Sequence, residues 1–176
     1  MGNHPKILLF KLFKENLACT NSFPENSILK FEIWRPSIKN FIPKGYGKKY
    51  LSFWVFHYLK VFKNRNYHAI LAYKENKLIG SLLLVPKYYK WDFMENNDLQ
   101  ITYVKVNKDE RGQGYGEILM KFTLQYLENI KFGDLWYITD TNNMTSQNLA
   151  YKCGFFLYSE CTRFEKLFFK ILKVKK

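Results

Sequence analysis

The segment Arg111-Gly112-Gln113-Gly114-Tyr115-Gly116 constrains this chain most, because it joins a strand pattern to a helix pattern through three glycines. Residues 99–106 (LQITYVKV) are rich in β-branched side chains and predict a strand. After the glycines, apolar side chains recur along one helical face, at Ile118, Leu119, Phe122, Tyr126 and Ile130. Glycines let a backbone approach a ligand closely, and a helix N-terminus offers N–H groups and partial positive charge. The segment therefore predicts a pyrophosphate cradle, with Arg111 as an added cationic fork.

Two familiar phosphate-binding loops do not match this segment. A Walker loop ends in Gly-Lys-Ser or Gly-Lys-Thr, whereas Gly116 is followed by Glu117 and Ile118. A dinucleotide-binding loop has the spacing G-x-G-x-x-G, whereas this chain has G-x-G-x-G. The remaining pattern is R-G-x-G-x-G after a strand that ends in Val-x-Val.

The rest of the chain predicts further strands and helices around this unit. Strand patterns occur at 28–34, 67–73, 77–85, 135–139, 155–159 and 164–171. Helix patterns occur at 48–63 and 146–152, and residues 6–13 fit either a strand or a helix. A length of 176 residues fits one domain, so we expect a single α/β domain over residues 1–176.

A second segment, Asn143 to Phe155, ends in Gly154-Phe155. With this segment, the strand and the glycine loop, the chain resembles the GNAT superfamily of acyl-CoA N-acyltransferases. The resemblance is well defined over 99–156 and weak before residue 66. It implies an α+β fold with a mixed, mostly antiparallel sheet, helices on its flanks and a splayed strand pair at the cofactor cleft. Residues 1–66 are expected to form a divergent acceptor-side part and 67–176 the cofactor part.

The resemblance also implies acetyl-CoA as the cosubstrate, without a metal. The opened strand edge at Val104, Lys105 and Val106 would pair with the pantetheine arm as another strand would. Backbone amides of the loop would hold the pyrophosphate, at Arg111, Gly112, Gln113, Gly114, Tyr115 and Gly116. Asn143 matches a cofactor-contacting Asn of the family, although a helix-capping role fits it nearly as well. Ser146 lies where the family often has a small residue near the cofactor.

Direct attack of an amine on a thioester calls for a general acid and a general base. Many family members carry a Tyr four residues before the Gly of Gly-Phe, and that position is Ala150 here. Tyr151 is the candidate acid, although it lies about 100° around the helix from Ala150. Asp98 is the candidate base, with Glu95 beside it, and the alternative for both carboxylates is solvation on a loop.

The net charge of +13 is unevenly distributed. Residues 98–160 hold six Lys and Arg against eight Asp and Glu, whereas the remainder holds 22 against seven. Such a basic surface can attract a polyanion, an acidic substrate or a phosphorylated cofactor, and the alternative is that it serves solubility alone. We expect a small-molecule or protein amine as acceptor, and a ribosome or another polyanion as an additional partner. The alternatives are a non-catalytic acyl-CoA-binding module, which Ala150 favours, and an RNA- or ribosome-associated protein.

The cysteines and histidines lack the spacing of a disulfide framework or a zinc site. They are Cys19, Cys153, Cys161, His4, His57 and His68. No apolar run approaches the ~20 residues of a membrane-spanning helix. The apolar N-terminal stretch is interrupted by Lys11 and Lys14, without a signal-peptide cleavage pattern after it. We therefore expect a cytoplasmic protein with no membrane partner.

Overall fold

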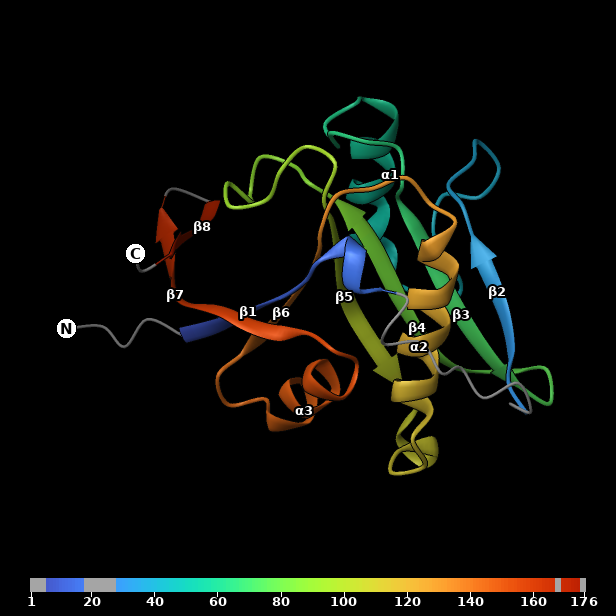
Figure 1. Ribbon diagram of the computed structural model, residues 1–176. Helices are drawn as coiled ribbons and strands as arrows, with labels where there is room; N and C mark the ends of the chain where they lie inside the picture. The colour runs from blue at the N-terminus through green and yellow to red at the C-terminus, as the bar shows by residue number, and fades with distance from the viewer. Residues whose placement is uncertain (1–5, 18–27, 167–168, 175–176) are drawn as a thin grey trace.

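The computed structural model describes residues 6–17, 28–166 and 169–174, and it contains an eight-stranded sheet (Figure 1). The sheet order is β2-β3-β4-β5-β6-β1-β7-β8. The strands are β1 (Lys6–Leu12), β2 (Lys30–Trp34), β3 (His68–Lys74), β4 (Lys77–Pro86), β5 (Leu99–Val106), β6 (Leu135–Asp140), β7 (Phe156–Lys166) and β8 (Phe169–Val174). Neighbours pair antiparallel except β5 and β6, which run parallel. This arrangement confirms the mixed, mostly antiparallel sheet.

The helices are α1 (Leu51–Tyr58), α2 (Tyr115–Glu128) and α3 (Met144–Lys152). Short 3-10 turns occur at Lys14–Asn16, Lys48–Tyr50 and Lys108–Glu110. The helix predicted over 48–63 is shorter, because Lys60 adopts a left-handed φ of 57° and the chain leaves the helix after Tyr58. The last strand pair is confirmed, but β7 runs to Lys166 and β8 begins at Phe169, whereas the strand patterns predict 155–159 and 164–171.

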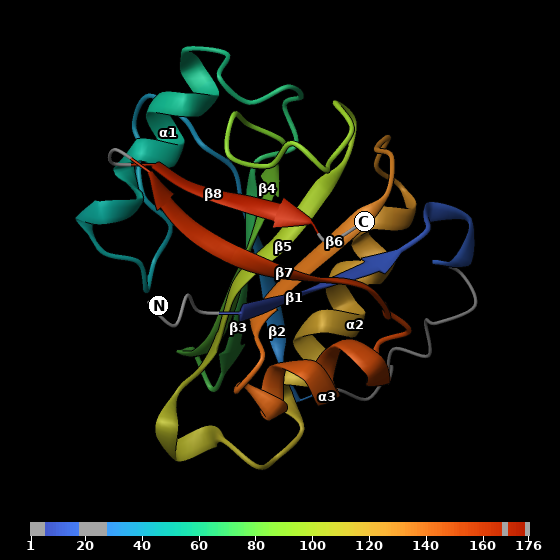
Figure 2. The same cartoon turned by 90° about the vertical axis from the view of Figure 1, so that its left-hand side faces the viewer.

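The ambiguous segment 6–13 forms β1, a strand inside the sheet between β6 and β7 (Figure 2). Ile7 and Leu9 pack into one core, and Phe10 and Leu12 into another, each almost fully buried. A strand that is buried on both faces is apolar almost throughout, so it lacks the alternation that identifies a strand from sequence.

Two apolar cores lie on opposite faces of the sheet, because side chains alternate along each strand. On β4, Leu82 and Leu84 join the core that α2 and α3 cover, whereas Leu83 and Val85 join the core beneath α1 and the 87–98 loop. The glycine loop and α1 therefore belong to opposite sides of the sheet.

A polar chain, exposed at Arg35 and buried at His68, links the end of β2 to α2 and β3. Arg35 Nη2 donates to Tyr126 Oη at 3.3 Å, and Tyr126 Oη lies 3.3 Å from His68 Nδ1. Burial lowers the pKa of His68 from 6.5 to about 4, and the positive charges of Arg35 and His57 add to the effect. Folded His68 therefore stays neutral where an unfolded histidine is protonated.

This difference predicts acid sensitivity of the fold. Because unfolded His68 binds a proton below about pH 6.5 and folded His68 only below about pH 4, stability falls as the pH drops through this window. The loss is at most about 3 kcal/mol. Urea unfolding measures the free energy of unfolding at pH 7 and at pH 4.5. The change in this free energy between the two pH values should be smaller for His68→Gln than for the parent. Equal pH dependence of the two proteins would contradict this account.

Candidate active site

The parallel strands β5 and β6 separate partway along their length. Only Leu99–Ile101 of β5 pair with β6, and their partners there are Leu135–Tyr137. Just beyond, a β-bulge in β5 shifts its register with β4, between the pairs Leu83–Thr102 and Ser81–Lys105. Tyr103 within this bulge has a φ of 53°, a left-handed conformation that few non-glycine residues adopt. The bulge turns the strand away from its partner and opens the sheet at this point.

A cavity of about 210 Å³ lies at the separation. It is lined by Thr102, Tyr103 and Val104 of β5, Tyr137, Ile138, Thr139 and Asp140 of β6, and Asn143 and Ser146 at the start of α3. Of the predicted cofactor residues, the structure therefore brings Val104, Asn143 and Ser146 to one cavity. Asn143 also caps α3, because its side-chain Oδ1 accepts from Ser146 N at 3.1 Å.

The other two residues of the predicted strand edge face different surroundings. Lys105 Nζ lies 4.6 Å from the Tyr46 ring centroid and 5.3 Å from that of Tyr50, on the α1 side of the sheet. Val106 packs against the core on the α2 side, near Gly116. Their predicted role thus concerns their backbone, since neither side chain lines the cavity.

The glycine loop follows the opened end of β5 and leads into α2. Gly112 and Gly114 have φ values of 81° and 78°, and Gly114 is the N-cap of α2. A methyl group at either glycine would meet nothing within 4 Å. The loop therefore faces open space, and it needs glycine for its backbone conformation rather than for packing within the protein.

Three side chains brace this loop against the sheet. Arg111 Nε donates to Val106 O at 3.2 Å, and Asn107 Nδ2 donates to Leu78 O at 2.8 Å. Lys74 Nζ lies 3.2 Å from Glu110 Oε2 and 5.3 Å from the Tyr115 ring centroid. These contacts fix the loop relative to the end of β5, which places the glycine amides beside the opened strand.

Tyr137 of β6 also lines the cavity, and it was not among the residues predicted from sequence. The residue is only 4% exposed and forms a hydrogen bond with the side chain of Ser146. Burial raises the pKa of Tyr137, the Ser146 hydrogen bond opposes the rise, and the nearby Cys153 adds to it. In the sequence, Tyr137 looks like an ordinary packed residue of an apolar strand.

Tyr151, the predicted general acid, lies outside the cavity. Its side chain is 53% exposed, and its ring packs edge-on against Phe10 of β1 with centroids 5.1 Å apart. Ala150, one position earlier, is fully buried. The helix therefore turns Tyr151 away from the residues that line the cavity, so the geometry does not support its predicted role.

Asp98, the predicted base, lies at the other end of β5, before the separation. Its carboxylate accepts from Glu95 N at 2.8 Å, Asp134 N at 2.9 Å and Trp136 Nε1 at 2.8 Å. It is only 3% exposed, whereas the neighbouring Glu95 is exposed. We assign Asp98 a structural role, because three donors hold it and it joins the 87–98 loop to β6.

Replacement of Asp98 by Asn should therefore lower stability rather than catalysis. An amide offers one acceptor oxygen in place of two and aims N–H groups at N–H donors, which should cost about 3 kcal/mol. Chemical denaturation measures the loss, with Glu95→Gln as the exposed control. Strongly reduced turnover of the folded variant, with unchanged unfolding free energy, would restore the catalytic assignment.

Aromatic side chains cover the α1 side of the opened strand. Tyr46 Oη donates to Tyr103 O of the bulge at 3.4 Å, and burial raises the pKa of Tyr46. The Tyr50 and Tyr103 rings meet edge-on at 4.9 Å, and Phe53 of α1 lies 6.2 Å from Tyr103. Residues of the 46–53 segment thus reach the bulge from the side opposite the glycine loop.

The described residues contain no group of three or more His, Cys, Asp or Glu that could hold a metal ion. Within the same ranges, no helix is long and apolar enough to cross a membrane. Cys153 and Cys161 are buried free thiols, whereas Cys19 and His4 lie outside the described residues.

Comparison with solved structures supports the fold. The chain is similar to a tandem GNAT protein from the clavulanic acid biosynthesis pathway, with 11% identity, a TM-score of 0.62, and coverage of 90% of this chain and 52% of that chain. It is also similar to a GCN5-related N-acetyltransferase-like protein from Streptococcus suis, with 12% identity, a TM-score of 0.56, and coverage of 97% of this chain and 61% of that chain. A third similar structure is IAA acetyltransferase from Bacillus cereus, with 14% identity, a TM-score of 0.51, and coverage of 82% of this chain and 95% of that chain. The chain spans 48–59% of the length of the first three structures it matches.

No curated protein matches the sequence. A family model does match, the acetyltransferase (GNAT) family, over residues 32–155. This span runs from within β2 to just past α3, includes the separated strands and the glycine loop, and covers more than half of the chain. The chain therefore belongs to the GNAT acetyltransferase family.

Proposed function

We propose that this protein is an acyl-CoA-dependent N-acyltransferase, which moves an acetyl group from acetyl-CoA to a primary amine of a small molecule or a protein. One observation carries the proposal: a glycine loop at a helix N-terminus directly follows the strand that bulges away from its neighbour. The proposed pyrophosphate site and the open strand edge would thus lie on one continuous segment, from Thr102 to Gly116. Membership of the family supports the same conclusion.

The residues fit an extended phosphorylated thioester. Amides between Arg111 and Gly116 would hold the pyrophosphate, and the backbone of Val104 to Val106 would pair with the pantetheine arm. Asn143 and Ser146 would contact the arm from α3, where both line the cavity. The thioester would then lie at the separation of β5 and β6, near Tyr103 and Tyr137.

The acetyl donor supplies an activated carbonyl carbon, on which the amine forms its new bond while the carbon–sulfur bond breaks. Tyr137 would donate a proton to the departing sulfur, because this residue lines the cavity and its raised pKa keeps the hydroxyl protonated at neutral pH. The proton lost by the amine would pass to water. Tyr46 is not a suitable base, because burial raises its pKa and so keeps its hydroxyl protonated at neutral pH. The same hydroxyl already donates its proton to Tyr103 O.

A catalytic role is favoured over a non-catalytic acyl-CoA-binding module. The only support for the module was Ala150 in place of a tyrosine, and Tyr137 offers a hydroxyl to the same cavity from β6. We also propose a cytoplasmic location, which the free thiols Cys153 and Cys161 support, because reducing compartments keep thiols unpaired.

A turnover assay tests the proposal. The purified protein is incubated with acetyl-CoA and a panel of amines, and free coenzyme A thiol is followed with a thiol reagent. Thiol release that depends on an amine, with mass-spectrometric detection of the acetylated amine, is the expected result. Acetyl-CoA binding without release for any amine would favour the non-catalytic module.

A further inference from the structure

The segment from Arg35 to Arg65 combines strong positive charge with exposed apolar side chains. It holds eight Lys and Arg and no Asp or Glu. The large apolar residues exposed in the same segment are Ile38 at 75%, Phe41 at 44%, Leu51 at 41%, Tyr58 at 41% and Leu59 at 70%. Single exposed apolar side chains are ordinary, but a cluster of them within a cationic surface indicates a binding site.

Trp54 of α1 connects most of these side chains, and Leu59 follows Tyr58 as the C-cap of the helix. The Trp54 ring lies 4.9 Å from that of Phe41 and 4.5 Å from that of Tyr58. Trp54 Nε1 donates to Ser37 O at 3.0 Å, which ties the turn bearing Ile38 to the helix. Leu51 lies one helical turn before Trp54, on the same side of α1. We call this set, with Leu59, the outer face of α1: Ile38, Phe41, Leu51, Trp54, Tyr58 and Leu59.

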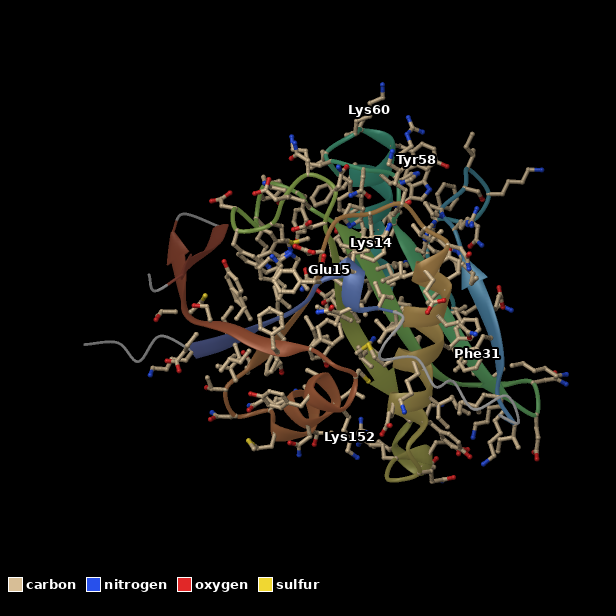
Figure 3. The ribbon with its side chains drawn as sticks, viewed as in Figure 1. Lys14, Glu15, Phe31, Tyr58, Lys60 and Lys152 are labelled. Carbon is tan, nitrogen blue, oxygen red and sulfur yellow. The ribbon has the colours of Figure 1, made fainter. Side chains whose placement is uncertain are left out.

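The inner side of the same helix is also apolar. Phe53 is buried among Tyr50, Phe62 and Tyr67. A helix that is apolar all round is normally covered on all sides, so the outer face calls for an occupant. Figure 3 shows Tyr58 and Lys60 at the top of the molecule, past the ends of the central strands.

The chemistry of this surface favours a lipid bilayer over the other polyanions. Exposed aliphatic side chains such as Ile38 and Leu59 cannot stack on nucleic-acid bases, whereas they fit the boundary between headgroups and acyl chains. Trp and Tyr are the aromatic side chains that prefer this boundary. Lysines around them, including Lys39 and Lys60, attract anionic headgroups, each contributing about 1 kcal/mol near the surface.

We propose that the outer face of α1 docks this protein peripherally on anionic phospholipid membranes. The expectation of no membrane partner rested on the absence of a spanning segment, and a peripheral surface needs none. Because the inner side of α1 contacts Tyr103 through Phe53, the bilayer would lie about one helix diameter, ~10 Å, from the opened strand. Docking itself requires neither acetyl-CoA nor catalysis, so its test is independent of the proposed function.

Vesicle co-sedimentation tests the docking. The probes are phosphatidylcholine vesicles, the same vesicles with about one third phosphatidylglycerol, and soluble polyuridylate as a nucleic acid. The parent protein should sediment with the anionic vesicles and much less with pure phosphatidylcholine. Leu59→Glu should lower the partition coefficient about tenfold, because it places a carboxylate at the headgroup boundary.

Leu157→Glu is the matched control. Leu157 is 44% exposed on β7, in the other half of the sheet, and the substitution makes the same change of charge. Its partition coefficient should stay within about twofold of the parent value. The proposal is overturned by absence of binding to anionic vesicles, by equal losses in both variants, or by polyuridylate binding that exceeds vesicle binding and is insensitive to Leu59→Glu.

Discussion

Replacement of Gly114 by Asp is expected to weaken acetyl-CoA binding at least about 100-fold, or about 3 kcal/mol. Gly114 is the N-cap of α2, with a φ of 78° and open space where a side chain would project. A carboxylate there would enter the space proposed for the pyrophosphate and repel its negative charge. Isothermal titration calorimetry of the parent and the variant measures the change.

Two control variants separate charge from backbone strain. Gly114→Ala carries the same left-handed strain, about 1 to 2 kcal/mol of stability, without the charge. Its loss of affinity should be at least about tenfold smaller than that of the aspartate. Gly47→Asp adds the same charge before α1, where a side chain also meets nothing within 4 Å, and should bind like the parent. Undiminished binding by Gly114→Asp would contradict the loop assignment.

Tyr137→Phe is expected to lower kcat on the order of 100-fold, with little change in KM for acetyl-CoA. The substitution removes only the hydroxyl that hydrogen-bonds with Ser146, and it keeps the ring packed near Phe155. Binding contacts along the glycine loop stay in place, so the effect should fall on the chemical step. Steady-state kinetics with the best amine found in the turnover assay measures both constants.

Tyr151→Phe is the matched comparison, since it removes one hydroxyl from the tyrosine predicted from sequence. Tyr151 is 53% exposed and lies outside the cavity, so its kcat should stay within about twofold of the parent value. A large loss in Tyr151→Phe with normal turnover in Tyr137→Phe would return the role of general acid to α3.

Local signals allowed the central unit to be predicted. The hairpin of β3 and β4, the strand β5, the glycine loop and α2 depend on alternation, turn residues and helical spacing, all of which lie within short stretches. The position of β1 could not be predicted in this way. Its pairing with β6 joins residues about 130 positions apart, such as Ile7 and Asp140, and no short-range pattern encodes that contact.

The roles of Asp98 and Tyr137 were harder to predict than the loop, for a related reason. Asp98 looks like a loop carboxylate until the fold brings Asp134 N and Trp136 Nε1 to it. Tyr137 looks like a packing residue until the separation of β5 and β6 opens a cavity beside its hydroxyl. In both cases the role depends on which strands become neighbours, whereas the glycine loop carries its chemistry in its own backbone.

The most direct test of the central claim is calorimetric titration of acetyl-CoA into the parent protein. We expect one acetyl-CoA to bind per chain with a dissociation constant in the micromolar range. A folded parent protein that shows no binding up to millimolar acetyl-CoA would contradict the account, because the glycine loop and the separated strands would then serve another ligand or none.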